Sequence, residues 1–347
     1  MASPMAIPTI GQRKWNLLTL FGALTTVCFG FSGFDFAQSR QEPLRTVRER
    51  AGQALSVSAS GVGNFPLAPQ EKKLMGIISS AGKEGKWTTA KSLFSNYTGV
   101  APPVFSAVLH AAFRCRQYRE GAKVYQQCRK RCKKVHAPVY VQALRIFGKL
   151  REDGVVRQVW AEALEECEFS SVLASARIAA AADAGDPETA EKVLDLMEKK
   201  EISIDVHHMS SAIRACWGWG KNRHKAAKYF FDLCPQVGVT PNLIVFTNLI
   251  GAYDSASLED IASAYQAMKK LEVVADPAFA ETYLVSVLSK PKDLKLRTPA
   301  FAAKWLNDKS VDRLRAAQEG LSDFEKDGVK LTALSKTLKD ALKKLDF

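Results

Sequence analysis

The sequence RKRCKK at residues 129–134 concentrates positive charge, with five cations among six residues. Such side chains can contact the phosphates of a nucleic acid, which gives affinity without sequence preference and weakens as salt rises. Cations also suit the end of a helix, where water solvates them and the helix dipole is negative. The candidate contacts to a nucleic-acid backbone are Arg129, Lys130, Arg131, Lys133 and Lys134.

Thiol and imidazole groups in the same region have a spacing that invites a metal interpretation. Cys128, Cys132 and His136 are four residues apart and would share one face of a helix. Cys128, however, takes the position that apolar residues such as Met197 and Met268 take in similar segments. No fourth ligand is evident, and zinc ligands are usually closer in sequence. The pattern therefore predicts no metal site.

The motifs of common enzyme classes are missing from the sequence. It has no glycine-rich loop followed by Lys-Ser/Thr that would cradle a phosphate. It also lacks the H-x-E and C-x-x-C pair of zinc deaminases, and no acidic cluster indicates a metallonuclease. We therefore expect neither enzymatic activity nor a cofactor.

The elements that carry these residues repeat about every 35 residues. Similar stretches begin at 73, 105, 173, 209 and 246, and each is typical of two helices joined by a short turn. One equivalent position of the first helix is occupied by Met75, Ser106, Val141, Ser175, Ser210, Thr247 and Glu281, which are 31, 35, 34, 35, 37 and 34 residues apart. A two-helix unit of this period indicates an α-solenoid, in which stacked neighbours bury apolar faces that no unit can bury alone.

Helix signals within single units favour the same fold. Pro187 suits the first turn of a helix, and Ala190, Val193, Leu194 and Met197 then form an apolar stripe at helical spacing. Alternating β-branched runs, which would indicate strands, are scarce. We predict an all-α protein of about six to seven two-helix repeats.

The C-terminal region, residues 286–347, is rich in lysine and is predicted to form helices that cap the array. A terminal repeat needs a polar outer face, and lysines here lie opposite one apolar stripe. Docking of RNA or of a partner is the second interpretation of this region. The stripe consists of Leu331, Leu334, Leu338, Leu342 and Leu345.

The ends of the repeated units identify the kind of helical repeat. The ends ISID (202–205), VTPN (239–242) and VVAD (273–276) are followed by unit openings such as HHMS (207–210) and IVFT (244–247). The sequence lacks the Leu-Gly-x-x-Tyr pattern of tetratricopeptide repeats. Over residues 71–285 it resembles the pentatricopeptide repeat family. This resemblance implies a right-handed superhelix that binds single-stranded RNA, with one base for each repeat.

The resemblance also implies which side chains read the bases. A residue of the first helix acts with the last residue of the same unit. The implied pairs are Ser175 with Asp205, Ser210 with Asn242, and Thr247 with Asp276. In the family, a hydroxyl with Asp favours guanine and a hydroxyl with Asn favours adenine, which predicts 5′-G-A-G-3′ for these units. Ser106 with His136 fits no standard pair. The alternative is that these residues are ordinary helix caps.

The family further places a side chain beside each base as a stacking wedge. Val172, His207 and Ile244 occupy that place here. An imidazole can stack on a base, and the alternative for His207 is an exposed residue of a helix cap.

Length and composition allow this interpretation. The 347 residues are 47% hydrophobic, and the formal charge of +13 suggests a polyanionic partner, either nucleic acid or an anionic membrane. The seven cysteines are odd in number and irregularly spaced, which indicates a reducing compartment and not a disulfide framework.

The N-terminal residues are predicted to be targeting segments and not part of the fold. Residues 1–36 contain Arg13-Lys14 and an uncharged stretch at 15–34 that is long enough to span a bilayer. Residues 37–70 are rich in Arg, Ser, Ala and Gly, as in a transit peptide or a disordered linker. Together they resemble the two-part presequence of proteins sent to plastids bounded by extra membranes. We expect a chloroplast location, with a signal anchor or a mitochondrial leader as alternatives.

The sequence thus predicts an organellar protein that binds single-stranded RNA and stabilises, processes or helps to translate a transcript by occupying it. The alternatives are a helical-repeat scaffold for protein partners, anchored in a membrane if residues 15–34 are retained, and a structural subunit of an organellar ribosome. Protein partners in a ribonucleoprotein are compatible with each of these hypotheses.

Overall fold

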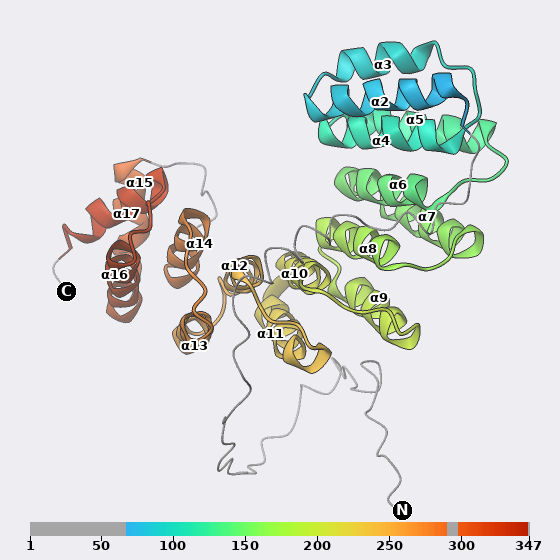
Figure 1. Ribbon diagram of the computed structural model, residues 1–347. Coiled ribbons are helices and arrows are strands. Elements are labelled where there is room, and N and C mark those ends of the chain that lie inside the picture. Colours follow the sequence, from blue (N-terminus) through green and yellow to red (C-terminus); the bar gives the residue numbers. More distant parts are fainter. Residues whose placement is uncertain (1–66, 290–297, 346–347) are drawn as a thin grey trace, which may run out of the picture. The chain divides into compact units, whose positions relative to one another are not determined.

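The computed structural model describes residues 67–289 and 298–345. The predicted signal-like segment (1–36) and residues 37–66 of the transit-like segment lie outside these ranges. The described residues form sixteen α-helices and no strand (Figure 1). Within the same ranges, no helix combines the length and the apolar character needed to cross a membrane. The predicted all-α fold is confirmed.

The helices follow one another as pairs with short connections (Figure 1). The first helices of the pairs are α2 (Pro69–Lys83), α4 (Pro102–Arg114), α6 (Ala137–Leu150), α8 (Ser171–Ala184), α10 (Val206–Ala215), α12 (Leu243–Ala252) and α14 (Pro277–Val287). The second helices are α3 (Trp87–Ser95), α5 (Tyr118–Arg131), α7 (Asp153–Glu166), α9 (Pro187–Lys199), α11 (Arg223–Leu233) and α13 (Leu258–Lys270). We call these two sets the A row and the B row.

The A row forms the spine of the molecule. Each A-row helix packs against the next one, from α2 on α4 to α12 on α14. Each B-row helix packs against its own A-row partner and against the following A-row helix. Every unit therefore shares its core with the next, and large buried side chains such as Phe105, Tyr140, Phe246 and Phe279 occur along the array. This stacking confirms the predicted solenoid.

Small residues let the backbones of neighbouring A-row helices approach closely. A Cβ atom placed on Gly82 would lie 2.8 Å from Cα of Ala111, and one on Gly148 would lie 2.8 Å from Cα of Ala180. These distances are shorter than van der Waals contact, so a larger side chain would push the two helices apart. The close contact between consecutive A-row helices depends on these glycines.

The recurring unit ends are helix stops followed by helix caps. A residue with positive φ ends the last B-type helix turn, and the N-cap of the next A-type helix follows four positions later. The amide after the positive-φ residue donates to a carbonyl five residues back, at distances of 2.8 to 3.2 Å. The positive-φ residues with their caps are Glu201 with Asp205, Gly238 with Asn242, Glu272 with Asp276, and Gly328 with Thr332.

The C-terminal region continues the pairing after one inserted helix. α16 (Val311–Lys326) packs against α14, and its Phe324 ring contacts Phe279 of α14 and Tyr265 of α13. The inserted helix α15 (Pro299–Asn307) and α17 (Ala333–Leu342) pack on each other. Of the predicted leucine stripe, Leu331 and Leu345 are half-buried, and the others are buried in α17. Since α16 pairs with α14, residues 286–347 contribute to a seventh helix pair.

Candidate nucleic-acid interface

The predicted base-reading hydroxyls lie on equivalent turns of the A row. Ser106, Ser175, Ser210 and Thr247 each stand in the second turn of their helix. Ser210 is buried, and the other three are half-buried. In an α-helix, the residues four and eight positions after a given residue lie on nearly the same side of the helix as that residue. Each of these hydroxyls therefore shares a helix face with the residues four and eight positions after it.

Ser175 and Asp205 are joined by a histidine that the sequence did not single out. His208 is fully buried in α10, and its Nε2 lies 2.9 Å from Ser175 Oγ of α8. The Nδ1 atom lies 2.7 Å from Asp205 Oδ1 and 3.1 Å from the Asp205 amide nitrogen. His208 therefore fixes the two predicted readers of one unit relative to each other.

The order Ser175, His208, Asp205 has the connectivity of a hydrolase triad, but its surroundings are structural. His208 Nε2 also lies 3.2 Å from the carbonyl oxygen of Ser171. Neither described pocket includes these residues. These hydrogen bonds join residues of α8 to residues of α10, so the network holds the two helices together.

Ser210 and Thr247 make local hydrogen bonds. Ser210 Oγ donates to the His207 carbonyl at 3.1 Å, and Thr247 Oγ1 donates to the Leu243 carbonyl at 2.7 Å. Each hydroxyl proton is therefore used within its own helix. The oxygen lone pairs can still accept a hydrogen bond from a ligand.

The partner residues of the predicted pairs cap helices. Asp205 Oδ1 accepts from the amides of His207 at 2.8 Å and His208 at 3.0 Å. Asn242 and Asp276 cap α12 and α14 in the same way, with distances of 3.1 and 2.7 Å. The capping alternative is therefore present in the structure. It does not occupy the whole carboxylate, because the Asp205 side chain is 51% exposed.

The three predicted wedge residues stand in the first turn of α8, α10 and α12, and all are exposed. Val172 is 50% exposed and Ile244 is 54% exposed. Aliphatic side chains left in water at the same place in two units are not part of the core. Their role in stacking stays a prediction.

His136 differs from the partner residues of the other units. It holds the N-cap position of α6, but its side chain makes no capping hydrogen bond and is buried. Burial lowers the pKa of His136 to about 4, so the imidazole is neutral at neutral pH. Because its environment is closed, His136 does not present a polar edge as Asp205 does.

Of the five predicted cations of residues 129–134, two are half-buried and contact neighbouring helices, and three are exposed. Arg129 bonds Glu166 Oε1 at 2.9 Å and the Tyr140 hydroxyl at 2.7 Å. Arg131 donates to the Tyr97 carbonyl at 3.0 Å and lies over the Phe105 ring. These two arginines hold neighbouring helices together. The exposed members of the run are Lys130, Lys133 and Lys134.

A second group of cations, which the sequence reasoning missed, lies on the A row. Burial and the charges of Arg114, Arg145 and Lys83 lower the pKa of His110, so cations from α2, α4 and α6 surround this imidazole. Further along, Asp183 of α8 pairs with Lys149 of α6 at 2.8 Å and with Arg214 of α10 at 2.9 Å. We call this group the basic strip; it consists of the cations Lys83, Arg114, Arg145, Lys149 and Arg214, together with the imidazole of His110 that lies among them.

The repeat period contained the signal for the basic strip. Lys83, Arg114 and Lys149 follow the equivalent first-helix residues Met75, Ser106 and Val141 by eight positions. His110, Arg145 and Arg214 follow Ser106, Val141 and Ser210 by four. Both offsets return to the same helix face. A comparison of the units at every position, and not only at the predicted reading positions, would have found the strip.

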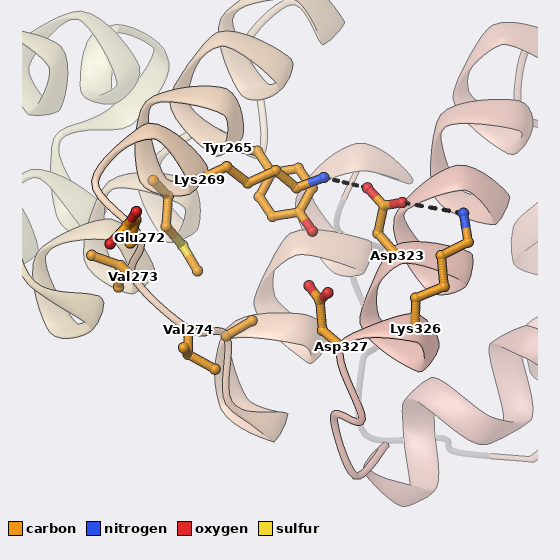
Figure 2. Close-up of a pocket in the computed structure, with 10 residues that line it drawn as sticks. Tyr265, Lys269, Glu272, Val273, Val274, Asp323, Lys326 and Asp327 are labelled. Atoms are coloured by element: carbon orange, nitrogen blue, oxygen red, sulfur yellow. Dashed lines mark hydrogen bonds and ion pairs between the residues drawn. The ribbon is translucent and has the colours of Figure 1, made fainter.

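A pocket of about 460 Å³ lies away from the A-row residues, between α13 and α16 (Figure 2). Its Lys269 and Lys326 are both paired with Asp323, so much of the positive charge is neutralised inside the pocket. The Tyr265 hydroxyl is buried and has no hydrogen-bond partner among the described residues. Burial and the charges of Asp323 and Asp327 raise the pKa of Tyr265, which keeps the phenol protonated.

The described residues include no group of three or more His, Cys, Asp or Glu side chains arranged to hold a metal ion. Cys128 Sγ lies 3.7 Å from Cys132 Sγ, and Cys128 is fully buried in the core. Burial raises the pKa of both thiols. The two cysteines act as core residues here.

Stacked helix pairs with a period near 35 residues define an α-helical repeat protein. Two family models match within the array: the pentatricopeptide repeat domain at residues 192–255 and the PPR repeat at residues 174–202. Residues 174–255 therefore carry pentatricopeptide repeats, the family that the unit ends predicted.

Solved structures of similar form come from the same family. The pentatricopeptide repeat protein PPR10 in complex with an 18-nt psaJ RNA element has 13% identity and a TM-score of 0.44, with 86% of this chain and 59% of that chain covered. A crystal structure of the pentatricopeptide repeat protein PPR10 from maize has 16% identity and a TM-score of 0.36, with 85% of this chain and 50% of that chain covered. The chain thus spans little more than half the length of these proteins. None of the curated proteins compared with the chain matches it.

Proposed function

We propose that this protein binds single-stranded RNA along the A row. The observation that carries the proposal is the basic strip, which places cations on α2, α4, α6 and α10 beside the repeated hydroxyls. Cations at equivalent positions of several successive helix pairs match a ligand that is itself a repeating chain of charges. Members of the family that were solved with RNA agree with this choice of partner.

The basic strip and the hydroxyl pairs would contact different parts of the RNA. Lys83, Arg114 and Lys149 would contact phosphates and supply affinity that is independent of sequence. Ser175 with Asp205 and Ser210 with Asn242 would then face the base edges, where a carboxylate and an amide accept and donate differently. The central units would favour G-A-G.

We propose further that the protein acts on a transcript in an organelle by occupying it. An RNA segment held along the A row can neither pair with another strand nor enter a nuclease. The chloroplast location rests on the composition of residues 1–70, most of which lie outside the described residues. This action requires no catalytic group, which agrees with the lack of enzyme motifs in the sequence.

The proposal predicts a strong and specific salt dependence. The full-length chain should bind a labelled single-stranded RNA that contains G-A-G, and its affinity should fall as salt rises. The double variant Lys83→Gln/Arg114→Gln should lower affinity at least about tenfold at low salt. The slope of log affinity against log salt should fall by about 0.7 for each lost phosphate contact. Fluorescence anisotropy across a salt series measures both quantities.

A matched control changes the same number of charges on the B row. Lys192→Gln/Lys225→Gln removes two exposed lysines from α9 and α11, and it should change affinity and slope little. Equal losses in the two double variants would reject the A row as the binding face. Absence of RNA binding at low salt would reject the function and favour a scaffold for protein partners. Selection from a random RNA pool without an enriched motif would instead favour a structural ribosomal subunit.

A further inference from the structure

The unit that contains α10 differs from its neighbours in the turn between its two helices. Ser210 and Thr247 are 37 residues apart, whereas the preceding units repeat after 31 to 35 residues. The turn contains two 3-10 helices, η2 (Cys216–Gly218) and η3 (Gly220–Asn222). Its sequence, CWGWGKN, adds two tryptophans to a part of the array that elsewhere has a short turn.

Trp217 of this turn lies on the side of the molecule where we place the RNA. Its indole rests against Gly251 of α12, which follows Thr247 by four positions as Arg214 follows Ser210, so Trp217 lies on the face of the A row that carries the basic strip. Arg214 belongs to the basic strip and pairs with Asp183. Trp217 is 42% exposed, so a large part of this residue is open to solvent.

The position of the indole ring is fixed by the next A-row helix. Nε1 donates a hydrogen bond of 2.8 Å to the Asn248 carbonyl of α12. A Cβ atom on Gly251 would lie 2.5 Å from Cζ2, so the ring rests directly on a glycine of the same helix. Arg223 donates to the Trp217 carbonyl at 3.4 Å and forms an ion pair with Asp254. The two contacts with α12 restrict rotation of the indole, and the Arg223 hydrogen bond holds the backbone of the turn.

We propose that Trp217 is a stacking platform for one unpaired base of the bound RNA. A flat aromatic surface that is already ordered loses little conformational entropy on binding, and stacking suits any base because each has a π face. The nearby cations would hold the phosphates on either side of that base. This inference rests on the proposed RNA-binding function and adds a contact that belongs to one unit only.

Two substitutions at Trp217 separate stacking from packing. Trp217→Phe keeps an aromatic ring and should weaken RNA binding by at most about threefold. Trp217→Leu keeps apolar volume but has no ring, and it should weaken binding about tenfold, in the range seen when base-stacking side chains are removed. The salt slope should stay as in the wild type, because no phosphate contact is lost. Trp160→Leu on α7, a B-row tryptophan, is the matched control and should leave affinity unchanged.

A scan with abasic RNA locates the stacked base. A series of oligonucleotides, each lacking one base, is titrated against the wild type and Trp217→Leu. At one position the missing base should weaken binding to the wild type and have little further effect on the variant. An equal effect on both proteins at every position would overturn the proposal. Unchanged affinity of Trp217→Leu for intact RNA would overturn it as well.

Two further outcomes also test the stacking proposal: a variant that does not fold, and a wild type that binds no RNA. If Trp217→Leu does not fold, as judged by circular dichroism, the emission of wild type minus Trp217→Phe reports on Trp217 among the six tryptophans of the chain. RNA should quench this difference signal, and lack of quenching would contradict stacking. If the wild type itself binds no RNA, the proposed function fails and the platform fails with it. Binding by the wild type without any Trp217 effect removes only the platform.

Discussion

At the scale of single residues, the caps of the A-row helices combine two roles that mutagenesis can separate. Asp205 accepts two amide hydrogen bonds of α10 and touches His208, yet half of its side chain is exposed. Asn caps helices about as well as Asp, because both present an oxygen to the amides. The structural role therefore tolerates a change that base reading should not tolerate.

Asp205→Asn is expected to leave stability nearly unchanged and to shift the base preference of its unit from G to A. Asp205→Ala should lower the free energy of unfolding by about 1 kcal/mol, because the cap is lost. Urea denaturation and binding to two RNAs that differ by G or A at the matched position measure the two effects. An unchanged preference in Asp205→Asn would show that Asp205 is only a cap.

The Tyr265 hydroxyl is a second residue-level feature with a measurable consequence. It is buried in the pocket wall and has no hydrogen-bond partner within residues 67–289 and 298–345, so the folded state bears the cost of its desolvation (Figure 2). Tyr265→Phe should be neutral or raise the free energy of unfolding by up to about 1 kcal/mol. Tyr125→Phe is the matched control; it removes a hydroxyl that bonds Glu162 at 3.1 Å and should lower stability. The melting temperatures of both variants test this expectation. A clear fall in the melting temperature of Tyr265→Phe would contradict it.

At the scale of elements, the contact between A-row helices depends on glycines that have no room for a side chain. Gly148 of α6 faces Ala180 of α8, where an added Cβ would lie 2.8 Å from Cα. Gly76 of α2 has no atom within 4 Å of such a Cβ. The same substitution should therefore have opposite effects at these two helical positions.

Gly148→Ala is expected to destabilise the protein by about 1–3 kcal/mol through overpacking. Gly76→Ala should stabilise it by about 0.5–1 kcal/mol, because alanine loses less backbone entropy in a helix. The urea midpoints of the two variants test this difference. A stabilised Gly148→Ala would mean that α6 and α8 can separate without cost.

The ends of the helices show how much of the fold could be predicted from local sequence. Asp205, Asn242 and Asp276 were visible as possible caps, because a cap bonds residues within three positions of itself. The roles of Arg129 and Arg131 were not visible. Their partners, Glu166 and Tyr97, are 37 and 34 residues away in the chain, so only the packing of consecutive units brings them together.

At the scale of the whole molecule, the cations of the A row and of the B row have different surroundings. The net charge of +13 suggested a polyanionic partner but not the surface that would meet it. In the structure, the cations of RKRCKK are partly used in internal contacts, whereas Lys83, Arg114 and Arg145 gather around His110 on the A row. The expected salt dependence is a property of this assembled strip and of no single unit.

The sequence by itself determined the repeat period, the all-α class and the resemblance to pentatricopeptide repeats, because these depend on short-range patterns repeated many times. Only the tertiary structure decided which side chains meet. It joined Ser175 to Asp205 through His208, gathered the basic strip from four helices, and fixed Trp217 against Gly251. The physical reason is that each of these contacts lies between units. It depends on the distance and rotation of neighbouring A-row helices, which close packing sets and no local pattern encodes.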